Sequence, residues 1–323
     1  MKRTTILLFL ITFSIVIQAQ TLRVTSTSTE IEALSGSVSA SGISITEANG
    51  TELVSRIYNA PTNDPSIETY IFQDGSFIVR ENIANFLVYD SFGRVQKSIS
   101  NSTQSQGGEA ISELAADQFG KTIVLFNPKV VIDGVTGSRA KVINSKNVPI
   151  DIYYSENRQL SVVEVSANGE FIALASVKSG SDDEVILTDR FGNILNTIEF
   201  DQPVKGVTFS ENGLFVTIYS GSRAAAFEVR SGDRIGSSSF RNTTLIFAGF
   251  DPIENIIVGL SGSGSPSISN IQLHAVNVTA RKIVRENLEG SLEVKGSLQF
   301  ERTGPGRYTI SGLDKELRIK AEF

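Results

Sequence analysis

Short apolar runs, separated by turn residues, alternate along most of the chain. Residues 159–200 show the pattern most clearly, with four β-rich runs: Gln159–Ser166, Phe171–Val177, Glu184–Thr188 and Ile194–Phe200. Asn168-Gly169 lies between the first two runs, and Gly192 lies between the last two. Asn-Gly pairs adopt the positive φ angles that tight hairpin turns need. The segment therefore predicts four short antiparallel strands joined by turns.

Two series of turn glycines repeat this unit along the sequence. The first turn recurs at intervals of 45, 49 and 44 residues and reappears later, at Gly75, Gly120, Gly169, Gly213 and Gly304. The second turn recurs at intervals of 43, 44, 55 and 40 residues, at Gly50, Gly93, Gly137, Gly192 and Gly232. In the fifth unit we expect the first turn near Asp251-Pro252-Ile253, because Asp and Pro also favour turns. A four-stranded unit with a period of roughly 40–50 residues is typical of a β-propeller.

The two series predict an all-β fold, a β-propeller of four-stranded antiparallel blades. We expect six blades, five of them continuous and one shared between the two ends of the chain, with the strand Glu316–Phe323 in the shared blade. Sharing a blade lets the N- and C-terminal strands close the ring, and closure removes exposed strand edges. A seventh blade built from residues 21–58 is the alternative.

Three segments between the turns need separate interpretation. Long insertions at Lys178–Asp183 and Ser261–Ser269 fall between the inner and outer strand pairs, which predicts that both lie on the same edge of the ring. The apolar spacing of Val278–Leu288 also suits a short amphipathic helix. Because this segment occupies the outer-strand position of the fifth unit, we interpret it as a strand.

The N-terminus has the layout of a secretory signal peptide. Lys2 and Arg3 precede an apolar run at Ile6–Ile17, and Ala19 then offers a small residue for cleavage. The run is too short to span a bilayer comfortably, since a spanning helix needs about 20 apolar residues. We predict cleavage after Ala19, which leaves residues 20–323 as a single extracytoplasmic propeller domain, periplasmic or secreted. An uncleaved anchor is the alternative.

Composition narrows the classes of function. The formal net charge is −6, the isoelectric point is about 5.1, and no run of Lys or Arg forms a basic patch. This acidity disfavours nucleic-acid binding, because a phosphate backbone repels negative charge. The chain has no cysteine, so it has neither disulfides nor thiolate ligands.

Two motifs resemble catalytic or nucleotide sites and are better explained by strands. The segment from Ala115 to Thr122 fits a relaxed phosphate-binding loop, but Ala115 replaces the first glycine and Ile123–Phe126 predicts a strand in place of the required helix. His274 is the only histidine and lies in an alternating strand. One histidine excludes His-Glu-x-x-His zinc sites, and no Gly-x-Ser-x-Gly elbow supports a Ser-His-Asp triad.

The acidic run Asp182-Asp183-Glu184 has oxygen ligands that suit calcium. Its spacing lacks an EF-hand pattern and does not recur in the other units, so we expect a solvated loop. The sequence therefore supplies no catalytic, cofactor-binding or metal-binding residues, and we predict no cofactor.

The best-formed repeat resembles a known family. The runs Ser166–Ser176 and Val185–Leu195 resemble the WD40-like repeats of six-bladed bacterial propellers of the TolB type, which place Ser-x-Asp-Gly at the first turn. This chain departs from the family pattern because it has no tryptophan and its first-turn Asp is usually Asn. The resemblance implies a fold and carries over no partner or site, because propellers support many functions.

The leading hypothesis for function is non-catalytic. We expect an exported propeller that acts as a protein-binding or scaffolding module of the cell envelope or surface, with another envelope or extracellular protein as its partner. The expected contact surface is the loop-bearing edge or the central face. The alternative is an exported hydrolase or lyase that uses carboxylates in the central channel to cleave a saccharide.

Overall fold

The computed structural model describes residues 21–28, 34–39, 42–47, 51–57, 68–143, 148–240 and 244–323. These residues form β-strands joined by turns, and they contain no helix. Accordingly, no described segment is a helix long and apolar enough to cross a membrane. The predicted signal peptide and the predicted turn at Gly50 lie outside the described residues.

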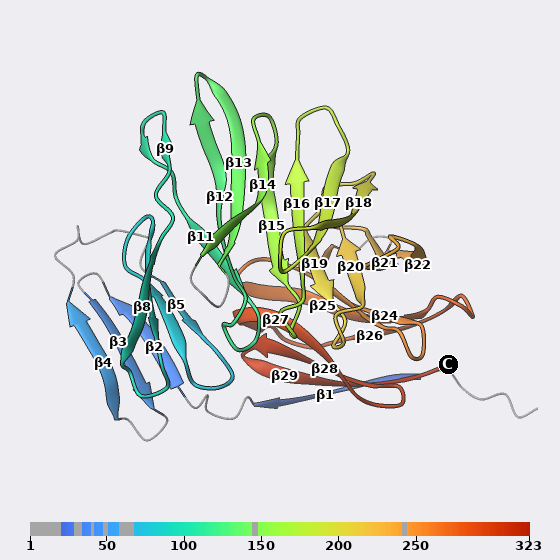
Figure 1. The fold of residues 1–323 in the computed structure, drawn as a ribbon. Helices are drawn as coiled ribbons and strands as arrows, with labels where there is room; N and C mark the ends of the chain where they lie inside the picture. The colour runs from blue at the N-terminus through green and yellow to red at the C-terminus, as the bar shows by residue number, and fades with distance from the viewer. Residues whose placement is uncertain are drawn as a thin grey trace, which may run out of the picture.

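Four sheets consist of four antiparallel strands in chain order (Figure 1). The first sheet contains β5 (Glu68–Ile71), β6 (Phe77–Arg80), β7 (Asn85–Tyr89) and β8 (Val95–Ser100). The second sheet contains β11 (Glu113–Ala116), β12 (Ile123–Ile132), β13 (Val135–Ile143) and β14 (Pro149–Ser155). The third sheet contains β15 (Gln159–Val165), β16 (Phe171–Val177), β17 (Asp183–Asp189) and β18 (Ile194–Phe200). The fourth sheet contains β19 (Gly206–Phe209), β20 (Phe215–Tyr219), β21 (Arg223–Glu228) and β22 (Arg234–Ser239).

The C-terminal third continues the pattern and includes the N-terminal strand. Its strands are β23 (Leu245–Asp251), β24 (Ile256–Ser263), β25 (Ser267–Asn277), β26 (Lys282–Asn287), β27 (Leu292–Gly304), β28 (Arg307–Leu313) and β29 (Lys315–Glu322). β1 (Thr21–Ser28) pairs antiparallel with β29, so strands from both ends of the chain share one sheet. Pairing of Ile268 on β25 with Leu292 on β27 joins these strands into one eight-stranded sheet. We call its β27, β28, β29 and β1 part the terminal sheet; Figure 1 shows β1 alongside β29.

Two smaller sheets complete the described strands. β2 (Leu34–Ser39), β3 (Gly42–Glu47) and β4 (Glu52–Ile57) form a three-stranded sheet, and β2 lies against β5. β9 (Gln104–Ser105) and β10 (Gly108–Glu109) form a short hairpin.

The sheets pack face to face around their first strands. β11 lies against β15, β15 against β19, β19 against β23, and β23 against β27. In β16, Ile172 and Leu174 pack toward the preceding sheet, whereas Phe171 and Ala173 pack toward the following one. Such a strand is buried on both faces, which explains why its sequence is a continuous apolar run rather than an alternating one.

Hydrogen bonds between successive turns tie the sheets together at one end. The amide of Gln73 donates to the carbonyl of Gln118 at 3.0 Å. Thr122 Oγ1 donates to the carbonyl of Gly169 at 2.9 Å, and Asn168 Nδ2 donates to the carbonyl of Asn212 at 3.3 Å. These hydrogen bonds connect the first turns of neighbouring sheets and help to hold the sheets together.

The Ser-x-Asn-Gly turns have one shared geometry. Ser166 Oγ accepts from the amide of Phe171 at 2.9 Å, and Ser210 Oγ accepts from the amide of Phe215 at 3.1 Å. Each serine also donates to the asparagine two residues later, which caps the turn. The side chains of these serines and asparagines therefore form hydrogen bonds that stabilise the hairpin turns.

Most predicted turns are confirmed. Hairpin turns follow β5, β11, β15 and β19, the expected turn after β23 occupies residues 252–255, and the segment near Lys282–Asn287 is the strand β26. The prediction for Gly137 is wrong, because Gly137 lies inside β13 and the connection between the third and fourth strands of this sheet begins only after Ile143. Asp133-Gly134 makes the preceding turn, between β12 and β13. A Cβ at Gly137 would lie 2.0 Å from the carbonyl oxygen of Ser155, so this glycine permits close strand approach.

The predicted insertion at Ser261–Ser269 is also corrected. β24 and β25 extend through most of it, and Ser263 pairs with Ser269, so only residues 264–266 form the turn. The serine-rich sequence suggested a loop, but the antiparallel pairing of β24 with β25 extends the hairpin instead. The insertion at 178–182 is a loop between β16 and β17.

Candidate functional site

Three turns share the tetrapeptide Asp-x-Phe-Gly. They occupy residues 90–93, 117–120 and 189–192, and each joins two adjacent strands. Two of them connect the third and fourth strands of a sheet, and one connects the first and second. Because antiparallel strands alternate in direction, both connections lie at the same end of a four-stranded sheet. We call this end the turn face.

Each tetrapeptide fixes its phenylalanine by the same hydrogen bond. The aspartate Oδ1 accepts from the phenylalanine amide at 3.0, 2.7 and 2.9 Å, in the pairs Asp90–Phe92, Asp117–Phe119 and Asp189–Phe191. The glycine that follows has a positive φ, at Gly93, Gly120 and Gly192. This local structure directs the aromatic ring away from the sheet.

The three rings are exposed and each has a cation beside it. Their exposed fractions are 73% for Phe92, 37% for Phe119 and 59% for Phe191. The charged groups of Arg94, Lys121 and Arg190 each lie 5.1 Å from the centre of the corresponding ring. Val95 and Ile194 are exposed apolar residues that follow two of these turns. Leu214, Ile235, Ile253 and Ile283 are also exposed and lie in or beside other turns of the turn face.

The sequence-predicted insertions lie at the opposite end of the sheets. The loop at 178–182 connects second and third strands, as does the turn at 264–266, which agrees with the prediction that they share an edge. Asp183 is not part of a solvated loop, and that expectation is wrong. It begins β17, is buried, and its Oδ2 accepts from the amide of Val204 at 2.8 Å. Glu184 pairs with Arg158 at 3.1 Å.

His274 is buried and has one hydrogen-bond partner. Its Nε2 lies 2.9 Å from Oγ of Ser261, and its Nδ1 has no partner. Burial, with the charge of Arg285 on the neighbouring strand, lowers the pKa of His274 to about 4. A Ser-His-Asp triad needs a carboxylate on Nδ1 and an accessible serine, so this pair is part of the core.

The segment that resembles a phosphate-binding loop is a hairpin, as predicted. β11 ends at Ala116 and β12 begins at Ile123. Asp117 accepts from the amides of Phe119 and Thr122, and Lys121 lies over the Phe119 ring. The loop geometry needed to surround a phosphate is therefore replaced by a capped turn.

Among the carboxyl groups of the described residues, Glu164 has the most strongly shifted pKa. It lies half-buried on β15, and burial raises its pKa to about 8. Burial and the Glu164 charge also raise the pKa of the Tyr219 phenol. No other carboxylate among the described residues contributes to the Glu164 shift. In the part of the chain that the structure describes, no three His, Asp or Glu residues form a group that could hold a metal ion.

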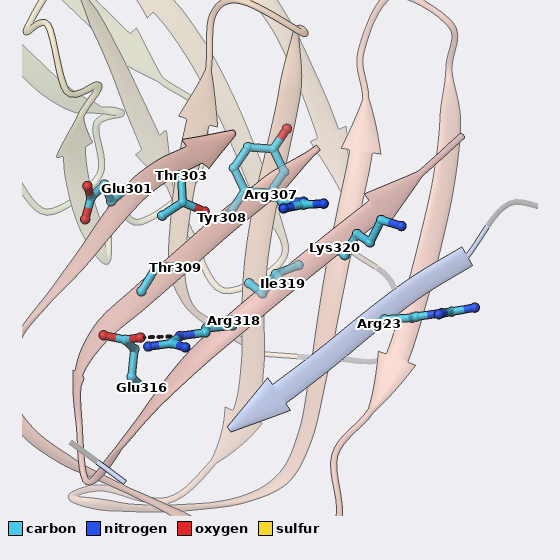
Figure 2. A pocket seen from close by; sticks show the side chains of 10 residues that line it. All are labelled: Arg23, Glu301, Thr303, Arg307, Tyr308, Thr309, Glu316, Arg318, Ile319 and Lys320. Atoms are coloured by element: carbon cyan, nitrogen blue, oxygen red, sulfur yellow. Dashed lines mark hydrogen bonds and ion pairs between the residues drawn. The ribbon is translucent and has the colours of Figure 1, made fainter. Parts of the chain in front are cut away.

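The terminal sheet differs from the others because only one face is apolar. Leu317, Ile319 and Ala321 of β29 are buried against the core, whereas Arg318 and Lys320 between them are exposed. The exposed face forms a shallow cavity of about 630 Å³ (Figure 2). Basic side chains dominate its lining, namely Arg23, Arg307, Arg318 and Lys320, together with Glu301 and Glu316.

Neither surface was identified from the sequence. The repeated Asp-x-Phe-Gly tetrapeptide was available as a signal, but periodic glycines alone do not show which side chains are exposed. The basic face requires the register of β1 against β29, which joins residues 301 positions apart.

Comparison with known proteins establishes the fold. The sequence matches no family model, and it matches no curated protein. Among solved structures, the chain is similar to the C-terminal WD40 domain of Sif2, with a TM-score of 0.53 and 10% identity, over 87% of this chain and 76% of that chain. The likeness confirms the WD40-like propeller resemblance at the level of the fold.

Proposed function

We propose that the protein is an exported β-propeller without catalytic activity, which binds another protein of the cell envelope or cell surface through its turn face. The observation that carries this proposal is the threefold display of an exposed phenylalanine on an Asp-x-Phe-Gly turn. The signal peptide predicted at the N-terminus supports export, and the WD40-like fold supports a binding module.

Exposed aromatic residues of this kind suit a protein interface. Aromatic rings dominate the energetics of interfaces, and arginine is enriched there with them. Folding does not require these rings to be aromatic, because Phe92 and Phe191 remain largely exposed to solvent. The backbone of each turn is fixed by its aspartate, so little entropy is lost when a partner covers the ring.

The proposal includes a ring of six blades with residues 20–323 as one domain. The pairing of β1 with β29 supports closure, because it places strands from both ends of the chain in one sheet. The sheet of β2, β3 and β4 beside β5 supports the seven-bladed alternative. For six or for seven blades, the contacts between the first strands of successive sheets support a radial arrangement of the sheets.

Crosslinking in the native host tests the binding function. A tagged copy is crosslinked, purified and examined by mass spectrometry for envelope or surface proteins. We expect a reproducible partner that is lost in the double variant Phe92→Ser, Phe191→Ser and retained in Tyr154→Ser. Tyr154 is a suitable control because it is 65% exposed and lies near the opposite end of its sheet. Retention of the partner by the double variant would exclude the turn face.

A saccharide hydrolase or lyase is the second candidate function, and Glu164 favours it. A carboxylic acid with a pKa of about 8 suits a general acid. Glycoside hydrolysis usually requires a second carboxyl group, and none contributes to the electrostatics of Glu164 within the described ranges. Release of reducing ends from acidic and neutral polysaccharides, abolished by Glu164→Gln, would establish this function in place of the first.

A further inference from the structure

Three basic residues form a row across the terminal sheet. In the strand register, Arg23 of β1 is opposite Lys320 of β29, and Lys320 is opposite Arg307 of β28. Directly opposite residues project from the same face of an antiparallel sheet, and like charges in that arrangement are destabilising. The row is therefore unfavourable for folding alone, in a chain whose net charge is −6.

Only part of this positive charge is neutralised by neighbouring residues. Lys320 forms an ion pair with Glu322, and Arg318 forms one with Glu316 at 2.8 Å. Arg307 has no ion-pair partner among the residues that the structure describes. Arg23 has no partner within ion-pair distance there, but its charge acts together with that of Lys320 to lower the pKa of Glu322. Two guanidinium groups consequently flank Lys320, and all three side chains are substantially exposed.

The row borders the cavity described above. Figure 2 shows the side chains of Arg23, Arg307 and Lys320 extending in a common direction from three adjacent strands. Adjacent strands are about 4.8 Å apart, so the backbones that carry the two arginines are separated by about 10 Å. Thr303 and Thr309 add hydroxyl groups to the lining. A ligand that fits must therefore present more than one anionic group across a short distance.

We propose that this face binds a small polyanion with two or more phosphate, sulfate or carboxylate groups. Each of these two guanidinium groups can form paired hydrogen bonds with one oxyanion, a geometry that a lysine ammonium cannot reproduce. Lys320 lies between them and adds charge to the centre of the site. The cavity volume of about 630 Å³ suits a ligand of the size of a disaccharide or an inositol polyphosphate.

Titration calorimetry on the mature protein at low salt tests the site. The probes are inositol hexakisphosphate for phosphate groups and a heparin-derived disaccharide for sulfate and carboxylate groups. We expect at least one probe to bind with an affinity that falls as salt rises. The double variant Arg23→Gln, Arg307→Gln should weaken binding at least tenfold, and Arg23→Lys, Arg307→Lys should weaken it by an intermediate factor. The control variant Lys129→Gln, Lys178→Gln removes two exposed cations from outside the terminal sheet and should bind normally.

Thermal unfolding supplies a second readout that separates binding from misfolding. Without ligand, the Arg23→Gln, Arg307→Gln variant should unfold at the same temperature as the natural protein or higher, because repulsion within the row is relieved. The rise in unfolding temperature caused by the probe should disappear in this variant. The proposal is overturned if neither probe binds at low salt, if the control variant loses binding equally, or if the double variant binds with unchanged affinity.

Discussion

The phenolic oxygen of Tyr308 lies 3.1 Å from Oδ2 of Asp251, and this contact joins the end of β23 to the terminal sheet. The same phenol lies 3.0 Å from Oε2 of Glu254, and Arg302 Nε donates to Asp251 at 3.1 Å. Burial and the two nearby carboxylates raise the pKa of Tyr308, so the phenol stays protonated and remains a donor.

We expect Tyr308→Phe to destabilise the protein by about 1–3 kcal/mol, because it removes a buried O–H donor that lies within hydrogen-bond distance of two carboxylates. The chain has no tryptophan to serve as a fluorescence probe, so the free energy of unfolding is measured by chemical denaturation followed by circular dichroism. Tyr154→Phe removes a phenol that is exposed, and it should change the stability by less than about 0.5 kcal/mol. Equal effects of the two variants would contradict a structural role for the Tyr308 hydrogen bond.

Gly120→Ala should destabilise the protein more than Gly134→Ala. Both glycines have positive φ, 62° and 77°, so both variants incur backbone strain of about 1–2 kcal/mol. A Cβ at Gly120 would lie 2.6 Å from the Phe72 ring, whereas nothing lies within 4 Å at Gly134. We expect an additional cost of about 1–3 kcal/mol at Gly120 from overpacking. Thermal unfolding of the pair measures the difference, and equal losses would contradict the contact.

Acidification should destabilise the protein through His274. The folded-state pKa of about 4 lies below the ordinary value of 6.5, so the unfolded chain binds a proton first as the pH falls. The stability from this group is complete above pH 6.5 and declines between pH 6.5 and 4, by about 3 kcal/mol in total. Denaturation curves at several pH values should show a shallower decline for His274→Gln, and parallel declines for both proteins would refute this assignment.

The exported protein should begin at Gln20, because the small residue Ala19 suits signal-peptide cleavage. Intact-mass measurement after expression in the native host checks the N-terminus. An Ala19→Phe variant should retain residues 1–19, since a bulky side chain obstructs the cleavage site. Retention of these residues by the unaltered chain would instead support the membrane-anchor alternative.

Local turn chemistry made much of the fold predictable. Asn168-Gly169 and Asn212-Gly213 mark hairpins because few residue pairs adopt the required backbone angles, and the same reasoning placed a turn at Asp251-Pro252. Gly137 was misassigned because the sequence alone does not distinguish a glycine that permits close approach of two strands from a glycine in a turn. Ser261, Ser263, Ser267 and Ser269 suggested a loop, although the strand pairing of β24 with β25 overrides that preference.

The candidate sites were less predictable because they depend on long-range register. The alternation of β29 is visible in the sequence, with Leu317 and Ile319 separated by Arg318. Nothing in that alternation indicates that Arg23 lies opposite Lys320, since that contact depends on which strand covers the free edge of β29. Exposure of Phe92 was likewise unexpected, because phenylalanine in a strand-rich chain is usually assigned to the core.

The pairing of β1 with β29 has a consequence for the order of folding. Thr21 Oγ1 donates to Glu322 Oε2 across 301 positions of sequence, so the earliest described strand finds its neighbour only when the last strand has been synthesised. Until then, β1 has an unsatisfied edge that could pair with another chain. The basic row spans the same seam, with Arg23 on one side and Arg307 on the other. Occupancy of the polyanion site would therefore report that both ends of the polypeptide have come together.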